Sequence, residues 1–211
     1  LDTFRDPPRK YSLAPFWFLN DVLDDDELRR QMDDFEHHGV FALVPHGRIG
    51  LPDDLVYLSE HWLHYFKVIA DHAAAKHMEI ILYDEAMYPS GSCAGQVAAA
   101  NPRHAARCIV QRPAGTALGA LEELVLEQDG HAYVHCPSNG TIRGIHFGED
   151  DGEPHAPLAG DILNPEAVRS FLHLTHDRYF DALKDHYGTT IVAIFTDEPN
   201  VLGRHQRAGA K

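Results

Sequence analysis

Short apolar segments alternate with amphipathic segments along most of the chain. The apolar segments, rich in aromatic and β-branched residues that predict strands, are 15–20, 40–46, 78–85 and 189–198. After the first of them, Leu28, Met32 and Phe35 recur at helical spacing between a capping Asp24 and a terminating Gly39. This spacing predicts a helix between the first two strands.

Two further helices follow the same logic. Ser59 caps a segment whose apolar positions, beginning with Trp62, recur at helical spacing. Asn164 and Pro165 form the start of another helix, and Gly188 ends it. Each predicted strand is therefore separated from the next by a predicted helix.

Strands that alternate with helices through short links are typical of parallel strands joined by crossover helices. The strands are near-continuous apolar runs, as expected when both faces of a sheet are covered. No G-x-G-x-x-G follows the first strand, so the doubly wound nucleotide-binding fold loses its usual support. The sequence predicts an α/β fold, a (β/α)8 TIM-type barrel of which only the N-terminal half is visible.

Four βα units fall short of the eight that close a barrel, which take about 250 residues. The chain has 211 residues. Half a barrel would leave open sheet edges, which are a poor stable state. We therefore expect a fragment, with the missing barrel half supplied by the rest of the native chain or by another chain.

The helical period disappears between the third strand and the third helix. This stretch predicts a hairpin around Asp129-Gly130 and a further strand over 140–148, followed by a polar Gly/Pro-rich loop. The expected organisation is barrel units one to three, then a β-rich insertion, then the third barrel helix and fourth strand of the same domain. The corresponding ranges are 1–106, 107–160 and 161–211. The insertion is either a wall of the substrate cleft or a surface elaboration.

Composition narrows the function. Lys and Arg number 18 against 32 Asp and Glu, a net charge of −14. This balance argues against binding a nucleic-acid backbone or an anionic membrane surface, and no apolar run approaches the roughly 20 residues of a membrane span. The three cysteines form no C-x-x-C pair, which favours reduced thiols over a disulfide framework or structural zinc. No signal peptide opens the sequence, but it starts at Leu1; the compartment is unknown, with a cytoplasmic location favoured.

Polar and aromatic side chains follow the end of every predicted strand. They are Asn20 after the first strand, His46 and Arg48 after the second, Tyr83, Asp84 and Glu85 at the third, and Asp197 and Glu198 at the fourth. In a parallel barrel these ends converge on the face that carries the active site. Carboxylates on two strands fit acid–base chemistry, in which one protonates a leaving group and the other activates water or attacks.

Neighbouring residues fit a sugar ligand. Trp17, Tyr83 and Tyr88 are candidate apolar platforms for sugar C–H faces, and Arg48, His46 and Asn20 are candidate hydrogen-bonding partners of hydroxyls. Simpler interpretations exist, because adjacent Asp and Glu at a strand end often form a solvated turn and Trp17 also suits a core position. Neither H-E-x-x-H nor G-x-S-x-G occurs, so we assign no metal ligands and no serine nucleophile.

The segments "ILYDEAMYPSGSCAG" and "IFTDEPN", in this order after the third and fourth strands, resemble the large bacterial glycoside hydrolases related to the α-L-rhamnosidases of family 106. The resemblance implies a catalytic (β/α)8 barrel that hydrolyses a glycosidic bond in an oligosaccharide or polysaccharide. Glu198 matches the acid that protonates the leaving oxygen. Asp197 would orient substrate or shift the pKa of Glu198 by charge repulsion, and Asp84 and Glu85 would line the sugar pocket.

The chain also departs from the family pattern. Cys93 stands where a more regular glycine pattern is expected, which affects the predicted loop shape. The second catalytic carboxylate is expected on a later strand, so the isolated fragment is expected to be inactive. No cofactor is assigned, although the wider group implies calcium, for which Asp84, Glu85 and Asp197 are candidate ligands.

Two other functions fit the same residues. One is a carbohydrate-binding barrel without catalysis. The other is a metal-dependent lyase or isomerase with His46, Asp84, Glu85 and Glu198 as ligands.

Overall fold

Four parallel strands form the main sheet, and they lie in it in chain order. The computed structural model describes residues 1–211 and orders the strands as β1 (Phe16–Leu19), β2 (Ala42–Gly47), β3 (Glu79–Tyr83) and β7 (Ile191–Phe195). Each neighbouring pair is parallel. The predicted strands and the α/β class are confirmed. The sheet has β1 and β7 as edges, so closure into a barrel stays a proposal.

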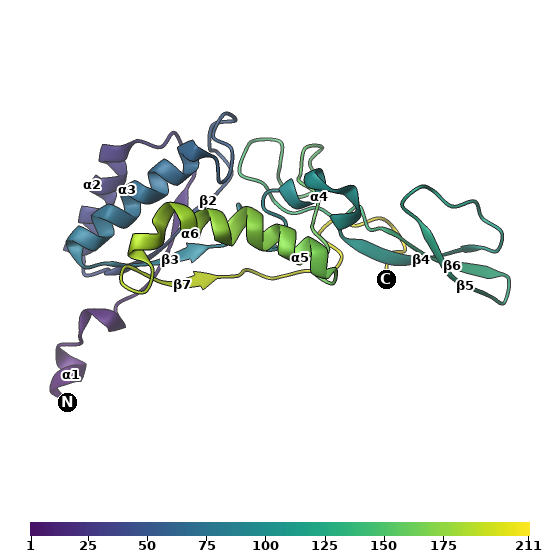
Figure 1. Ribbon diagram of the computed structural model, residues 1–211. Helices are drawn as coiled ribbons and strands as arrows, with labels where there is room; N and C mark the ends of the chain where they lie inside the picture. The colour runs from purple at the N-terminus through teal and green to yellow at the C-terminus, as the bar shows by residue number, and fades with distance from the viewer.

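Helices connect successive strands and lie along one face of the sheet (Figure 1). They are α2 (Asp25–His37), α3 (Glu60–Lys76) and a continuous run of α5 (Pro165–Leu172), the π-helical turn η3 (His173–Asp177), α6 (Arg178–Leu183) and η4 (Lys184–His186). The predicted caps are confirmed, because the side chains of Asp24, Ser59 and Asn164 each accept a hydrogen bond from a first-turn backbone N–H. Smaller helical turns are α1 (Asp2–Arg5), η1 (Arg9–Tyr11), α4 (Gln96–Ala100) and η2 (Pro102–His104).

The main core lies between the sheet and these helices. Trp62 of α3 stacks on Phe66, with 5.2 Å between ring centroids, and its indole Nε1 donates to the hydroxyl of Tyr179 in α6 at 3.1 Å. All three side chains are buried. A buried indole N–H needs an acceptor, so this hydrogen bond joins α3 to α6 at little cost in desolvation.

The opposite face of the sheet is open. Phe16 and Phe18 of β1 and Phe195 of β7 are 44%, 47% and 37% exposed, whereas Trp17 and Leu19 between them are buried under the helices. The expectation that both faces are covered is therefore wrong for these residues, because every crossover helix lies on the same side. Alternating side chains, which point to opposite faces of a strand, divide the apolar runs into a core set and an exposed set.

A second, antiparallel sheet forms most of the insertion. Its strands are β4 (Arg107–Pro113), β5 (Glu123–Gln128) and β6 (His131–Pro137), in the order β4-β6-β5, and we call residues 107–137 the β-module. The predicted hairpin is confirmed, with Asp129 and Gly130 at φ 50° and 75° as a two-residue turn of this kind requires.

The strand predicted over 140–148 does not form. Only Thr141 makes isolated bridges, to Leu158 and Arg204. The chain turns instead because the carboxylate of Glu149 accepts hydrogen bonds from the backbone N–H groups of Ile145 and His146. A local side-chain acceptor thus replaces the partner strand that the apolar pattern suggested.

Residues 201–211 pack on the β-module. Ile109 and Lys211 exchange two backbone hydrogen bonds, of 3.0 and 3.1 Å. Leu202 and Ala210 contact a small apolar cluster within the β-module. The domain boundaries stay a prediction, but the segment that follows the fourth strand lies with the β-module.

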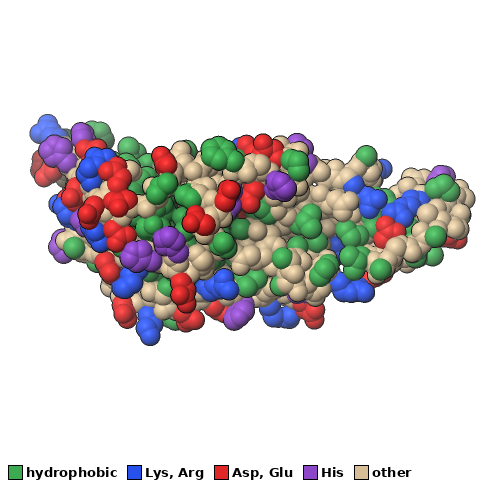
Figure 2. Space-filling view, turned by 90° about the horizontal axis from the view of Figure 1, so that it is seen from above, with side chains coloured by type: hydrophobic (Ala, Val, Ile, Leu, Met, Phe, Trp, Pro, Cys, Tyr) green, Lys and Arg blue, Asp and Glu red, His purple; other side chains and the backbone are tan.

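Charged side chains are unevenly spread over the surface. Seen from the helix side, Asp, Glu and His side chains gather over the end formed by α2 and α3 (Figure 2). Ion pairs join α2 to α3 there, as between His72 and Asp33 at 2.8 Å and between Lys76 and Glu36 at 3.0 Å. None of the helices combines the length and apolar character needed to cross a bilayer.

The Trp62–Tyr179 hydrogen bond yields a test of the core. Tyr179→Phe leaves the indole N–H buried without an acceptor, so we expect the free energy of unfolding to fall by about 1–3 kcal/mol. Urea denaturation followed by circular dichroism measures it. Tyr133→Phe, at a partly exposed tyrosine of β6, is the control and should change stability by less than about 0.5 kcal/mol. Equal effects of the two substitutions would contradict the assignment.

Candidate active site at the strand ends

The carboxyl ends of β3 and β7 are joined by hydrogen bonds. The hydroxyl of Tyr83 donates to Oδ2 of Asp197 at 2.6 Å, and the backbone N–H of Asp84 donates to the carbonyl of Phe195 at 3.1 Å. Burial, and then the bond to Asp197, raises the pKa of Tyr83 well above its usual value, so the hydroxyl remains a donor. Polar groups from two strands that are distant in sequence therefore meet at one edge of the sheet.

Four aromatic side chains form a row across the open face at this edge. We call Phe18, His46, Tyr83 and Phe195 the aromatic row. Phe18 pairs in register with His46, and Tyr83 with Phe195. The rings of His46 and Tyr83 are stacked, with 4.3 Å between centroids, and Tyr83 also stacks on Phe195. Burial, helped by the charge of Arg48, lowers the pKa of His46 to about 4, so the imidazole is neutral at neutral pH.

Arg48 borders the row. Its guanidinium carbon lies 4.5 Å from the centroid of the Phe18 ring. This cation–π contact holds the positive charge at one end of the aromatic row. Asn20, at the end of β1, is exposed, and its carbonyl lies against the backbone of Gly50, where an added Cβ would collide. Arg48 is thus directed to the open face, while Asn20 is exposed to solvent.

Asp197 and Glu198 occupy the turn after β7. Asp197 is half-buried, and its backbone exchanges two hydrogen bonds with Ser90: its N–H donates to Oγ at 2.9 Å and its carbonyl accepts from N–H at 2.8 Å. Glu198 is exposed and adopts a φ of 41°, a left-handed conformation that costs energy for a residue with a side chain. The hydrogen bonds between Asp197 and Ser90 hold the turn in which Glu198 adopts this conformation.

Asp84 points to the helix side rather than to the open face. Its two carboxylate oxygens accept hydrogen bonds of 2.6 Å from Ser90 and Thr196, and Nε2 of His176 in the π-helical turn lies 3.7 Å away. Asp84 follows Tyr83 directly, so alternation along the strand places the two side chains on opposite faces. The carboxylate therefore ties β3, β7 and the loop containing Ser90 together beneath the open face.

Glu85 is buried and organises the loop after β3. Its carboxylate accepts hydrogen bonds from five backbone N–H groups, those of Ala86, Gly91, Ser92, Cys93 and Ala94. Burial raises the pKa of Glu85 to about 7, while the N–H donors, Ala94 first, act in the opposite direction. The side chain is only 1% exposed. The sequence led us to expect Glu85 in a sugar pocket, but its oxygens face the backbone of the loop. These hydrogen bonds set the shape of the loop around Cys93.

Two aromatic candidates also lie away from the open face. Trp17 is buried against α2, where its Nε1 donates to Oε1 of Gln31 at 2.8 Å, so its position contrasts with the expected sugar platform. Tyr88 accepts a hydrogen bond of 3.2 Å from Arg143, and the guanidinium of Arg204 lies 5.2 Å from its ring. Both positions are set by contacts within the protein.

Those two arginines are themselves fixed. Arg143 and Asp150 form a pair at 2.7 Å, and Arg204 and Asp151 form one at 2.8 Å. The segment around 143–151 and the segment after β7 therefore hold Tyr88 from two sides.

The structure directs His46, Arg48, Tyr83 and Asp197 toward the open face, with the rings of His46 and Tyr83 buried against Phe16. It sets Trp17, Asp84 and Glu85 behind that face or within the loop. Sequence reasoning missed the contribution of Phe18 and Phe195 to the row. The alternation of "FWFL", with Trp17 and Leu19 facing the core, carried that signal, but all four residues are apolar and so read as one buried run.

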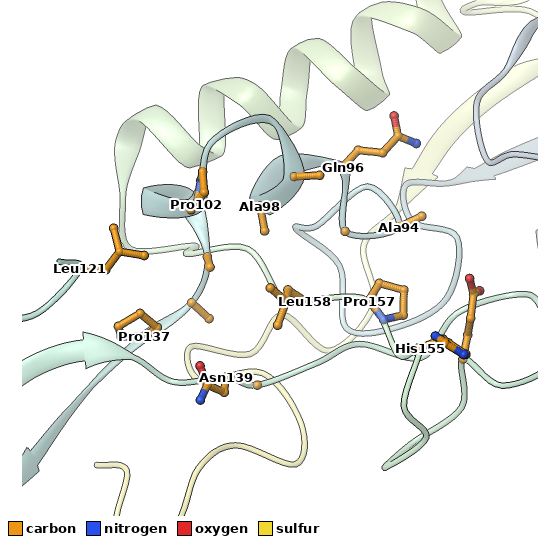
Figure 3. Close-up of a pocket in the computed structure, with 16 residues that line it drawn as sticks. Ala94, Gln96, Ala98, Pro102, Leu121, Pro137, Asn139, His155, Pro157 and Leu158 are labelled. Carbon is orange, nitrogen blue, oxygen red and sulfur yellow. The ribbon is translucent and has the colours of Figure 1, made fainter. Parts of the chain in front are cut away.

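The larger pockets lie elsewhere. A pocket of about 580 Å³ separates α4 from the β-module, with Ala98, Pro157 and Leu158 among its walls (Figure 3). The carboxylate lining it, Glu149, is engaged by backbone N–H groups, so this pocket lacks a free acid–base pair. A smaller one, of about 270 Å³, adjoins Asp84 and His176 on the helix side.

The implied calcium ligands do not fit a metal. Oxygens of Asp84, Glu85 and Asp197 already accept short hydrogen bonds from Ser90, from the loop and from Tyr83. The molecule contains no group of three or more His, Cys, Asp or Glu side chains placed to hold a metal ion.

No protein-family model matches the chain, and no curated protein matches it. Among solved structures it is similar to a rhamnosidase from Novosphingobium sp. PP1Y, with 16% identity over 69% of this chain and a TM-score of 0.43. The chain spans 13% of that protein's length.

The loop around Glu85 yields a second test. Glu85→Gln turns one acceptor oxygen into an amide that faces N–H donors, so we expect a loss of about 2–4 kcal/mol in stability. Amide exchange at Gly91–Ala94 should accelerate by about tenfold or more. Hydrogen exchange followed by NMR measures it, with the exposed Glu60→Gln as control. Exchange rates unchanged by Glu85→Gln would show that the carboxylate does not hold the loop.

Proposed function

We propose that this chain contributes to the active site of a glycoside hydrolase that acts on an oligosaccharide or polysaccharide. The observation that carries the proposal is the Tyr83–Asp197 hydrogen bond, which places a carboxylate beside the aromatic row, whose Phe18 and Phe195 rings are exposed. Sugars present apolar C–H faces and hydroxyl edges, and a site with both an aromatic surface and charged hydrogen-bonding groups suits them. α-L-Rhamnosides are the first substrates to test, given the resemblance of the two strand-end motifs.

The aromatic row would form the floor of the sugar site. Phe18 and Phe195 are the exposed members of this row, and Arg48 supplies guanidinium donors at its end. The neutral His46 supports Tyr83 by stacking without adding a second positive charge. In a (β/α)8 barrel, the last residues of the strands lie at the mouth, where substrates bind. Further βα units added beyond the β7 edge would complete that mouth.

Glu198 and Asp197 would have different roles in the reaction. Glu198 is exposed and is the proposed general acid, because protonation of a leaving oxygen requires a carboxyl group that can reach it. Asp197, fixed by Tyr83 and Ser90, is the proposed neighbour that orients the sugar. Glu85 and Asp84 enter the proposal as positioning residues, since their oxygens bond the loop and the strand ends. The second carboxylate that glycoside hydrolysis uses would come from another strand.

Carbohydrate binding without catalysis is the alternative that the aromatic row also supports. The row and Arg48 would serve both functions, whereas turnover needs Glu198. A metal-dependent lyase or isomerase has less support, because Asp84 and Glu85 face protein donors rather than a shared centre with His46.

Glu198→Gln tests the acid. In the natural protein that carries this sequence, we expect turnover of aryl glycosides to fall by about 10²–10⁴-fold, since an amide cannot protonate the leaving oxygen. Circular dichroism should show an unchanged fold, and the exposed Asp185→Asn should leave turnover unaltered. Full activity in Glu198→Gln would remove this residue from the acid role. Sugar binding without turnover in the unsubstituted protein would favour the alternative.

Phe18→Ala tests the floor. Loss of an aromatic surface worth about 0.5–1.5 kcal/mol should weaken sugar affinity by roughly 3–10-fold. Isothermal calorimetry with the natural protein and its best glycoside measures the change. Phe180→Ala, at a 51% exposed phenylalanine of α6, is the matched control. Equal affinities in both variants would place the sugar elsewhere.

A further inference from the structure

Two of the three cysteines face one another across the β-module. Cys108 of β4 is the register partner of Cys136 of β6 in the antiparallel pair. Their sulfur atoms are 3.8 Å apart, and the side chains are only 3% and 0% exposed. The neighbouring hydrogen bond from the N–H of Ser138 to the carbonyl of Ala106, 2.8 Å long, continues the same ladder and fixes the register. The juxtaposition is therefore set by the backbone of both strands.

The cysteine pair and the third cysteine, Cys93, lie in different environments. Leu202 and Ala210 of the last segment pack against the cluster that contains the pair, and Nη1 of Arg207 lies 3.4 Å from the sulfur of Cys136. Cys93 lies in the main core instead, where its sulfur donates to the carbonyl of Leu174 at 3.7 Å. The chain thus contains one pair of adjacent thiols and one buried thiol without a cysteine neighbour, which serves as an internal control.

We propose that Cys108 and Cys136 are an oxidation site, at which a peroxide converts the two thiols into a cross-strand disulfide. Register partners in an antiparallel pair have Cα atoms about 4.5–5.5 Å apart, inside the range of about 4.4–6.8 Å that disulfides span. The sulfur atoms must approach from 3.8 Å to about 2.05 Å. Small rotations of the two side chains achieve this, with β4 and β6 already paired.

The reaction balances with hydrogen peroxide as the oxidant. The sulfur of one cysteine attacks the peroxide, the O–O bond breaks, and a sulfenic acid and one water form. The second thiol then attacks that sulfur, a disulfide forms, and the hydroxyl leaves as a second water. The two sulfurs together lose two electrons, which reduce one peroxide to two waters.

The pH dependence follows from the thiols. Burial, followed by the hydrogen bond to Cys136, raises the pKa of Cys108 to about 11. The reactive species is the thiolate, and its fraction below the pKa increases about tenfold for each pH unit. Oxidation is therefore slow near neutral pH and accelerates as the pH rises.

The disulfide would stabilise the β-module against local opening. It would close the loop between positions 108 and 136, which includes the exposed strand β5. Cross-linking restricts the unfolded chain more than the folded one, so the β-module would open less readily. This inference is independent of the proposed glycosidase activity.

Peptide mapping of the peroxide-treated chain tests the proposal. Free thiols are blocked with N-ethylmaleimide in acid before proteolysis, which prevents exchange. We expect a linked peptide joining Cys108 to Cys136, two hydrogens lighter than its reduced parts, with Cys93 blocked. Its formation should be about tenfold faster for each pH unit between pH 6.5 and 8.5, and the apparent melting temperature should rise by roughly 5–10 °C and return with dithiothreitol.

Substitutions supply the controls. Cys93→Ser should retain the linked peptide and the melting shift, whereas Cys108→Ser should lose both. The unsubstituted chain is decisive by itself, so a poorly folded variant does not weaken the test. Absence of the linked peptide, a link that involves Cys93, or separate oxidation of Cys108 and Cys136 to sulfinic acids would each overturn the proposal.

Discussion

The carboxylate of Glu85 fixes the geometry at the end of β3, and the candidate site depends on it. Five backbone N–H groups converge on its two oxygens, which forces residues 91–94 to wrap around one side chain. This wrapping sets the position of Ser90, whose hydroxyl donates to Asp84 and accepts from the N–H of Asp197. A buried acid that contacts no solvent therefore determines where the outer carboxylates lie.

The alternation of side chains along β3 and β7 decides which polar groups reach the open face. Tyr83 and Asp197 bond each other above the sheet, while Asp84 and Thr196, one position away on each strand, bond each other on the helix side. Two parallel strands that end together thus produce two separate polar contacts. The upper one borders the aromatic row, and the lower one belongs to the scaffold. A shift of one residue in either strand would exchange these environments.

The sequence was sufficient to predict the four strands of the main sheet, the three long helices and their N-caps, because Asp24, Ser59 and Asn164 act within one turn of where they stand. It did not predict β4, and the strand it predicted over 140–148 does not form. It was also sufficient to place polar residues at the strand ends. It was insufficient for Glu85, since five N–H donors in an irregular loop leave no periodic pattern. The sequence did not show that the Trp17 side chain faces the core, because its neighbours on both sides are equally apolar. The Cys108–Cys136 pair depended on a register across a 28-position separation.

The π-helical turn in the helix before β7 has a consequence for spacing. The buried residues of this run, Ala167, Phe171, Thr175, Tyr179 and Leu183, recur every four positions. In a regular α-helix, four positions exceed one turn by about 40°, so such a row would rotate away from the core. The wider turn at 173–177 offsets this drift and returns Tyr179 to Trp62. The same turn presents His176 to Asp84. Deleting one residue there would restore an ordinary helical phase and separate the imidazole from the carboxylate.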